Sequence, residues 1–350
     1  MNRRQFSAIL GSAPLWAAHS RALSAEPPTR NDLKAQRHAI LSRMELAMGP
    51  FPKKKIKPPL DMKIIERADT STIFRWKISY VSERGDRTPG YLLRPKKLKG
   101  RVPGILCLHQ TTPLGAAEPA GLGGNPEYHY AEELAERGYV TLAPDYPDLP
   151  FGNGFGGYHY DAYRWGYRSQ TMKGIWNHTR AVDLLQSMPE VDAKRLGCIG
   201  HSLGGHNTLF VGAFDPRLQV LVSSCGFTSF KEYHGGDLSG WGQERYMPLI
   251  ALQYHNNPAE MPFDFSDVLT ALAPRPLFIN APLHDANFSV EGVREALKIV
   301  EPIYAEKFHA GNRLVVRHPN AAHSFPNAVR YEAYQFIDKW LQGPSRKDEG

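Results

Sequence analysis

The chain has 350 residues, enough for one large domain or two small ones, with ordinary hydrophobic (42%) and charged (22%) fractions for a globular protein. Its formal net charge of +7 falls to +4 without residues 1–25, which hold three arginines and no acidic residue. So mild a charge does not indicate a nucleic-acid partner. We interpret the lysine-rich run at residues 53–57 as a solvated loop.

The first 25 residues have the order of an export signal. Arg3 and Arg4 precede a weakly apolar stretch over residues 8–18, and small residues follow up to Ala25. This is the order of charged region, apolar region and cleavage site in a signal peptide, and the arginine pair resembles a twin-arginine signal. The apolar stretch is too short to remain as a stable membrane anchor, so we expect a periplasmic or secreted protein.

The remaining chain begins with an extension and continues as one domain. Residues 26–70 are expected to form a helix from Asn31 to Met48 followed by a linker rich in Pro and Lys, and residues 344–350 a short tail. The main domain is expected over residues 71–343. At its start we expect strands at 70–81 and 89–94, which are predicted to form an antiparallel hairpin.

From residue 103 onward, strands and helices alternate. The apolar runs predict strands at 104–109, 139–143, 195–200, 220–225, 276–281 and 313–316, and helices at 130–137, 165–186, 204–214, 290–308 and 327–341. Alternating strands and helices of this length predict an α/β fold, with a mostly parallel central sheet and helices on both faces. The long aromatic stretch at about 226–267 is expected to be an insertion over the active site.

The three cysteines do not suggest a disulfide framework. Cys107, Cys198 and Cys225 lie in or at the end of apolar runs, which predicts buried cysteines that pack as small hydrophobic residues. No cluster of Cys and His has the spacing of a zinc site, so we expect no metal.

The central motif is Gly200-His201-Ser202-Leu203-Gly204. It has the form G-x-S-x-G, between a predicted strand and a predicted helix, which is the context of a nucleophile elbow. A serine on so sharp a turn needs neighbours almost without side chains, because the strand and the helix approach closely. The motif therefore predicts Ser202 as nucleophile, with the backbone N–H of Leu203 facing the developing oxyanion.

A serine nucleophile needs a base, and the base needs an orienting acid. In the chain order Ser, acid, His, the acid is expected to follow the strand at 276–281, which selects Asp285. The base is expected after the strand at 313–316, where His323 and His318 both occur. We favour His323, because His-x-Phe leading into the last helix is the arrangement that this motif order usually shows.

Other polar residues have secondary roles in this interpretation. The backbone N–H of Gln110 is predicted as the second oxyanion donor. Asp145 is interpreted as a structural loop residue and His206 as a packing residue. Candidates for the substrate pocket are His109, His201, Trp241 and His284.

These motifs resemble the α/β-hydrolase superfamily, nearest to its dienelactone-hydrolase-like and acetylxylan-esterase-like branch. The resemblance rests on residues 90–95, Leu106 to Gln110, residues 143–146 and the elbow, together with the loops of Asp285 and His323. It implies neither a metal nor an organic cofactor. Dienelactone hydrolases proper use Cys as nucleophile, so Ser202 favours ordinary ester hydrolysis.

The sequence thus predicts an exported hydrolase of carboxylic esters that acts on a small-molecule or carbohydrate ester. One alternative is a serine peptidase of the prolyl-oligopeptidase type, although the N-terminal extension is too short for a propeller. Another is a non-catalytic binding protein with the same fold. The natural ester and the oligomeric state stay open.

Overall fold

A computed structural model gives the structure of residues 30–52, 57–149 and 155–342. The expected signal segment, the tail and most of the lysine-rich run lie outside these residues. Nine strands form one sheet in the order β1-β2-β3-β5-β4-β6-β7-β8-β9. The strands are β1 (Lys63–Arg67), β2 (Ile73–Glu83), β3 (Asp86–Pro95), β4 (Val102–Leu108), β5 (Val140–Pro144), β6 (Val191–His201), β7 (Leu218–Ser224), β8 (Leu277–Asn280) and β9 (Leu314–Arg317).

The sheet has an antiparallel and a parallel part. β1, β2, β3 and β5 pair antiparallel in succession, whereas β5, β4, β6, β7, β8 and β9 pair parallel. The mostly parallel α/β sheet is therefore confirmed. The sheet begins earlier than residue 71, because β1 pairs with β2. All five residues of β1 are exposed, so the strand lacks the buried alternation by which a sequence predicts strands.

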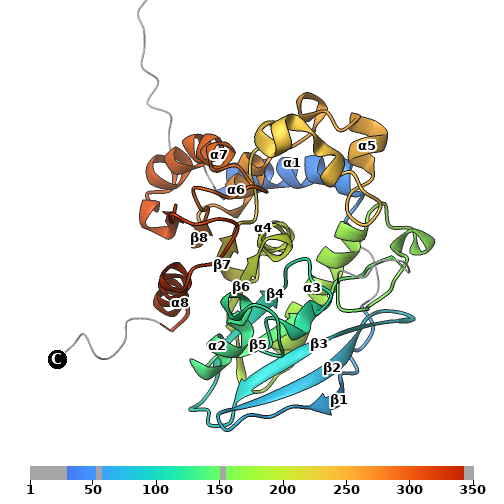
Figure 1. Cartoon of the computed structure of the whole chain (residues 1–350), viewed down its shortest axis with the longest axis vertical. Helices are drawn as coiled ribbons and strands as arrows, with labels where there is room; N and C mark the ends of the chain where they lie inside the picture. The colour runs from blue at the N-terminus through green and yellow to red at the C-terminus, as the bar shows by residue number, and fades with distance from the viewer. Residues whose placement is uncertain (1–29, 53–56, 150–154, 343–350) are drawn as a thin grey trace, which may run out of the picture.

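Helices cover both faces of the sheet (Figure 1). Their apolar faces belong to two separate cores, one with α3 and α4 and the other with α2 and α8. The helices are α1 (Arg30–Met48), α2 (Tyr130–Glu136), α3 (Gln170–Ser187), α4 (Leu203–Phe214), α5 (Leu249–Tyr254), α6 (Phe265–Leu272), α7 (Val290–Pro302) and α8 (Asn327–Leu341).

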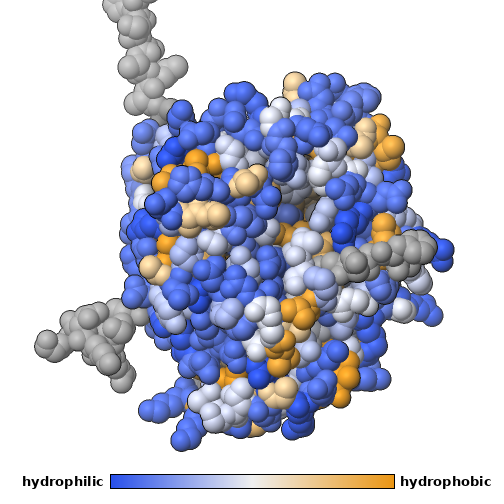
Figure 2. All heavy atoms as spheres, in the orientation of Figure 1, coloured by the Kyte–Doolittle hydropathy of each residue, from blue (hydrophilic) through white to orange (hydrophobic). Residues whose placement is uncertain are grey.

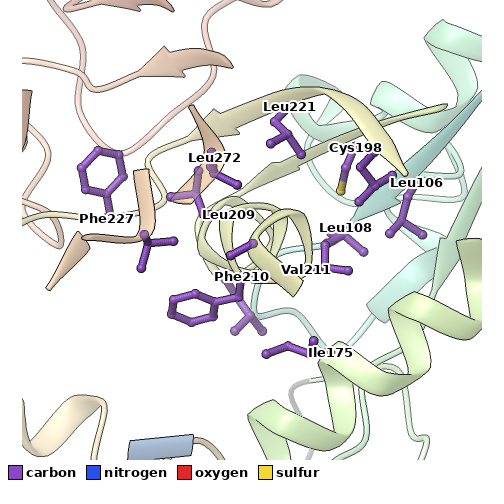
Figure 3. Packing of buried hydrophobic residues seen from close by; sticks show 14 of the residues in the cluster. Leu106, Leu108, Ile175, Cys198, Leu209, Phe210, Val211, Leu221, Phe227 and Leu272 are labelled. Atoms are coloured by element: carbon purple, nitrogen blue, oxygen red, sulfur yellow. The ribbon is translucent and has the colours of Figure 1, made fainter. Parts of the chain in front are cut away.

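Successive residues of the central strands supply the two cores in turn. In β4, Ile105 and Cys107 belong to the core of α2 and α8, whereas Leu106 and Leu108 face α3 and α4. Figure 3 shows Leu108 near Val211 of α4 and Leu106 near Cys198 of β6. This alternation follows from the two-residue period of a strand, and it leaves a continuous apolar run with no polar face. All three cysteines are buried and free, as expected.

Helix α3 begins later than predicted. A separate turn of 3-10 helix covers Ala162–Trp165 and ends at Gly166, whose φ of 82° breaks the helical path. Ser169 then caps α3, because its side chain accepts a hydrogen bond from the N–H of Met172 at 3.0 Å.

The stretch at 226–267 consists of short helical turns together with α5 and the start of α6. At this end of the molecule α1 packs on α5 and α6, and α6 packs on α4 and α7 (Figure 1). The visible surface is largely hydrophilic, with apolar residues in small separate groups (Figure 2). None of the helices in the described residues is both long and apolar enough to cross a membrane.

Candidate active site

Ser202 lies on the sharp turn between β6 and α4. Its φ of 53° and ψ of −117° are values that residues with a Cβ rarely adopt. The N–H of Ser202 donates to the carbonyl oxygen of Ser224 on β7 at 2.8 Å, which anchors the turn to the neighbouring strand. Ser202 lines a cavity at the carboxyl ends of the parallel strands.

Three glycines allow this turn because the chain passes too close for a side chain. A Cβ on Gly204 would stand 1.9 Å from the carbonyl oxygen of Leu108, and one on Gly200 would stand 2.3 Å from that of Gly204. A Cβ on Gly205 would stand 2.6 Å from the carbonyl oxygen of Ser224. Each obstacle is backbone, so the N-terminus of α4 can approach β4 and β7 only with glycine at these positions.

Asp285 and His323 form a hydrogen-bonded pair. The Nδ1 atom of His323 lies 2.9 Å from both carboxylate oxygens of Asp285. The N–H groups of Asn287 and Phe288 also donate to the carboxylate, at 2.8 and 3.0 Å. Burial alone would raise the pKa of Asp285, but His323 and the two N–H groups hold it below its ordinary value. The carboxylate therefore stays ionised and fixes the orientation of the imidazole.

The His323 ring lies near the elbow. Its centroid is 4.8 Å from that of His201, the residue before Ser202. It is 5.9 Å from the ring of Phe288, which lines the same cavity as Ser202. Tyr128 stacks on His201 at 4.3 Å, and its hydroxyl donates to the carbonyl oxygen of His323 at 3.5 Å. The loops after β6, β8 and β9 thus meet at one place.

The cavity beside Ser202 has a volume of about 150 Å³. A cavity of this size holds a group comparable to one six-membered ring. Its wall combines the elbow, the loop after β4, the stretch after β7 and the loop of Asp285. The lining residues are Thr111, Ser202, Leu203, His206, Tyr233, Gly240, Trp241, Tyr246, Asn287 and Phe288.

One group of potential metal ligands occurs in this region. The ligand atoms of Cys225, Asp285 and His323 lie within 4.8 Å of one another. Burial, and then the negative charge of Asp285, raise the pKa of the Cys225 thiol well above its ordinary value. A thiol that stays protonated is a poor metal ligand, and Nδ1 of His323 is already bonded to Asp285. These residues therefore fit a hydrogen-bonded acid and base better than a metal centre.

Comparisons with known proteins find relatives among hydrolases and esterases. A family model described as glucuronyl esterase of fungi matches residues 152–306, which hold Ser202 and Asp285. YtaP of Bacillus subtilis (strain 168), named only as a hydrolase, is 29% identical over 272 residues, covering 73% of this chain and 84% of YtaP.

Two further comparisons concern glucuronoyl esterases. The 4-O-methyl-glucuronoyl methylesterase 1 of Wolfiporia cocos is 23% identical over 202 residues, covering 53% of this chain and 50% of that protein. A solved glucuronoyl esterase from Solibacter usitatus has a TM-score of 0.71 at 16% identity, covering 89% of this chain and 94% of its own. The chain has the α/β-hydrolase fold. The family match and the esterase relatives support a carboxylic ester hydrolase.

Of the candidates for the substrate pocket, only Trp241 is among the described residues that line the cavity. His109 is fully buried, and its Nδ1 lies 2.6 Å from the carbonyl oxygen of Gln110. His284 is exposed and bonds to Asn320 at 2.7 Å. His318 bonds through Nδ1 to the carbonyl oxygen of Ala281 at 2.7 Å, so it supports the end of β8. His201 is buried within the elbow, with its ring between those of Tyr128 and His323.

The structure also places residues on the cavity wall that the sequence analysis assigned elsewhere or missed. His206 follows Ser202 by four residues on α4, so helical spacing alone would have placed both on one face. Asn287 and Phe288 follow Asp285 by two and three residues. Tyr233 and Tyr246 lie in the stretch after β7 that is expected over the active site, although no periodicity predicts where its individual side chains point.

We predict that Gly204→Ala abolishes hydrolase activity and lowers stability by more than about 2 kcal/mol, because the new methyl group meets backbone. The matched control is Gly174→Ala in α3, where a Cβ meets nothing closer than 4.0 Å. That helix-interior change should be neutral or slightly stabilising. Urea unfolding and ester hydrolysis measure both effects. A fully active Gly204→Ala protein would contradict the close approach.

The buried carboxyl group of Asp145 should make the stability of the protein depend on pH. Burial raises the pKa of Asp145 to about 7, although its carboxyl group accepts a hydrogen bond from the N–H of Ala116 at 2.7 Å. The folded protein therefore keeps a proton that the unfolded chain loses between about pH 4 and 7. The stability that Asp145 contributes is complete below about pH 4 and declines as the pH rises through about 7.

Relative to the parent protein, Asp145→Asn should accordingly gain stability as the pH rises across this window, on the order of a few kcal/mol. Urea unfolding of both proteins at pH 4.5, 6 and 8 measures the difference. Parallel pH profiles for the two proteins would show that Asp145 keeps its ordinary pKa.

Proposed function

We propose that this α/β hydrolase cleaves carboxylic esters of carbohydrates through an acyl-enzyme, with Ser202 as nucleophile, His323 as base and Asp285 as orienting acid. The observation that carries the proposal is the Asp285–His323 pair, bonded at 2.9 Å beside the cavity that contains the strained Ser202. The order Ser, acid, His agrees with the motif order of such hydrolases.

In the first step, Nε2 of His323 takes the proton of the Ser202 hydroxyl as Oγ attacks the ester carbonyl carbon. Asp285 bonds to Nδ1 and stabilises the imidazolium ion that forms. The same proton then passes from Nε2 to the oxygen of the leaving alcohol. A water molecule, deprotonated by His323, attacks the acyl-enzyme and releases the acid with Ser202 restored.

The oxyanion of the tetrahedral intermediate needs backbone donors. Leu203 begins α4 and lines the cavity, so its N–H and the positive end of the helix favour negative charge there. The loop after β4 supplies the second donor in this proposal. Gln110 is the residue predicted for it. Its side chain bonds to Glu118 at 2.9 Å, and the adjacent Thr111 lines the cavity, so the N–H of Thr111 is an alternative donor.

A carbohydrate ester is supported by the match to the glucuronyl esterase family and by the methylesterase relative. The test compares purified protein with Ser202→Ala, His323→Ala and His318→Ala on p-nitrophenyl acetate, acetylated xylan and a benzyl ester of glucuronic acid. Ser202→Ala and His323→Ala should each lower kcat by about 1000-fold or more. His318→Ala, the control, should keep activity within about threefold because His318 only supports β8.

The three esters separate the substrate classes. Acetylated xylan as the preferred substrate indicates a deacetylase, and the glucuronate ester as the preferred substrate indicates cleavage on the uronic acid side. Activity on peptides alone would replace the ester assignment with a peptidase. A properly folded protein that cleaves none of these substrates would support a non-catalytic role.

We also propose that the chain is exported by a twin-arginine-type signal in residues 1–25. The double change Arg3→Lys and Arg4→Lys keeps the charge but removes the arginine pair. A C-terminally tagged chain with this change should stay in the cytoplasm, whereas the parent chain should appear in the periplasm or medium. Cell fractionation with immunodetection measures this. Equal export of both chains would contradict the proposal.

A further inference from the structure

The buried amide of Asn280 bonds to two segments that the proposed reaction requires. Asn280 is the last residue of β8 and is 1% exposed. Its Nδ2 atom donates to the carbonyl oxygen of Ser324 and to Oγ of Ser224, at 2.9 Å each. A carbonyl oxygen only accepts, so the nitrogen of this amide must face Ser324. Because Ser324 directly follows His323, one amide group connects the loop of the base to the end of β7.

The contact with Ser224 continues to the nucleophile elbow. Oγ of Ser224 lies 2.9 Å from Nδ1 of His201, the residue directly before Ser202. Burial lowers the pKa of His201 well below its ordinary value, so the ring is neutral and Nδ1 can accept the hydroxyl proton of Ser224. The carbonyl oxygen of Ser224 also accepts the N–H of Ser202 at 2.8 Å. Ser224 therefore holds the elbow through its side chain and through its backbone.

Two other side chains bond to the backbone beside His323, and both bonds are weaker. The thiol of Cys225 donates to the carbonyl oxygen of Ser324 at 3.3 Å. The hydroxyl of Tyr128 donates to the carbonyl oxygen of His323 at 3.5 Å. A thiol is a weak donor, and 3.5 Å is long for a hydroxyl group. The amide of Asn280 is therefore the strongest of the three donors to these two carbonyl groups.

Proton transfer in the proposed reaction depends on where His323 stands relative to Ser202. Asp285 orients the imidazole through Nδ1, but the place of the ring also depends on the backbone of its loop. A displacement of about 1 Å can lower a rate about 100-fold. We infer that Asn280, together with Ser224, is a positioning residue that holds the loop of His323 in place relative to Ser202. This inference rests on the proposed function and adds two residues that do not line the cavity.

The test measures kcat and KM for p-nitrophenyl acetate with Asn280→Ala and with Ser224→Ala. Each variant should lower kcat about 10-fold or more, because His323 loses its fixed place. KM should stay within about threefold of the parent value, because the cavity wall is unchanged. The second variant removes only a hydroxyl group, so it serves if Asn280→Ala does not fold. A folded variant of either kind that keeps the parent kcat would overturn the inference.

The matched control is Asn177→Ala in α3. Asn177 is also buried, and its amide donates to the hydroxyl of Tyr158 at 3.3 Å and accepts from Lys173 at 2.7 Å. Asn177 does not line the cavity. This variant should lose stability in urea unfolding and still keep kcat within about threefold of the parent value. An equal loss of kcat in Asn177→Ala and Asn280→Ala would assign both effects to the loss of a buried amide and overturn the inference.

A double variant tests whether Asn280 and Ser224 act together. Residues in one hydrogen-bond network have effects that do not add. The kcat of the protein with both changes to Ala should therefore lie within about twofold of the lower single variant. Two losses that multiply would show independent actions and overturn the inference. Absence of Ser202-dependent hydrolysis of every ester by the parent protein would instead overturn the proposed function.

Discussion

The close approach of helix α4 to the sheet is the constraint on which the site depends. Gly204 packs against the carbonyl oxygen of Leu108 at a distance that admits no side chain, and Gly205 does the same at Ser224. At the turn that leads into this approach, Ser202 has the strained φ of 53°. The strain is maintained because the central strands and α4 share a dry core, so the turn cannot relax without separating them.

The parallel sheet brings the remaining groups to the same place. In a parallel arrangement the carboxyl ends of successive strands share one edge, so the loops after β4, β6, β8 and β9 converge although they are far apart in sequence. These loops carry Thr111, Ser202, Asp285 and His323. Asp285 is buried and bonded on several sides, whereas His323 is partly exposed. Rigid strands hold this pair, and the stretch after β7 completes the wall around Ser202.

Much of this arrangement was predictable from local sequence, because it depends on local physical requirements. The glycines around Ser202 reflect a steric demand at fixed spacing, and Asp285 and His323 each follow an apolar strand. The choice between His323 and His318 as the partner of Asp285 could not be made without the structure. Both residues follow β9, and only His323 bonds to Asp285. The cavity wall was less predictable. The position of His206 near Ser202 could be predicted from helical spacing. The positions of Tyr233 and Tyr246 depend on irregular turns, and no periodic pattern in the sequence predicts the path of such turns.

The proposed mechanism requires that Ser202 is the activated nucleophile. Labelling of the folded protein with a fluorophosphonate probe, followed by peptide mapping by mass spectrometry, tests it most directly, because such probes react with a serine activated by a neighbouring base. We expect a single adduct, on the peptide that contains Ser202, and no adduct after heat denaturation. An unlabelled folded protein, or an adduct on another serine, would contradict it.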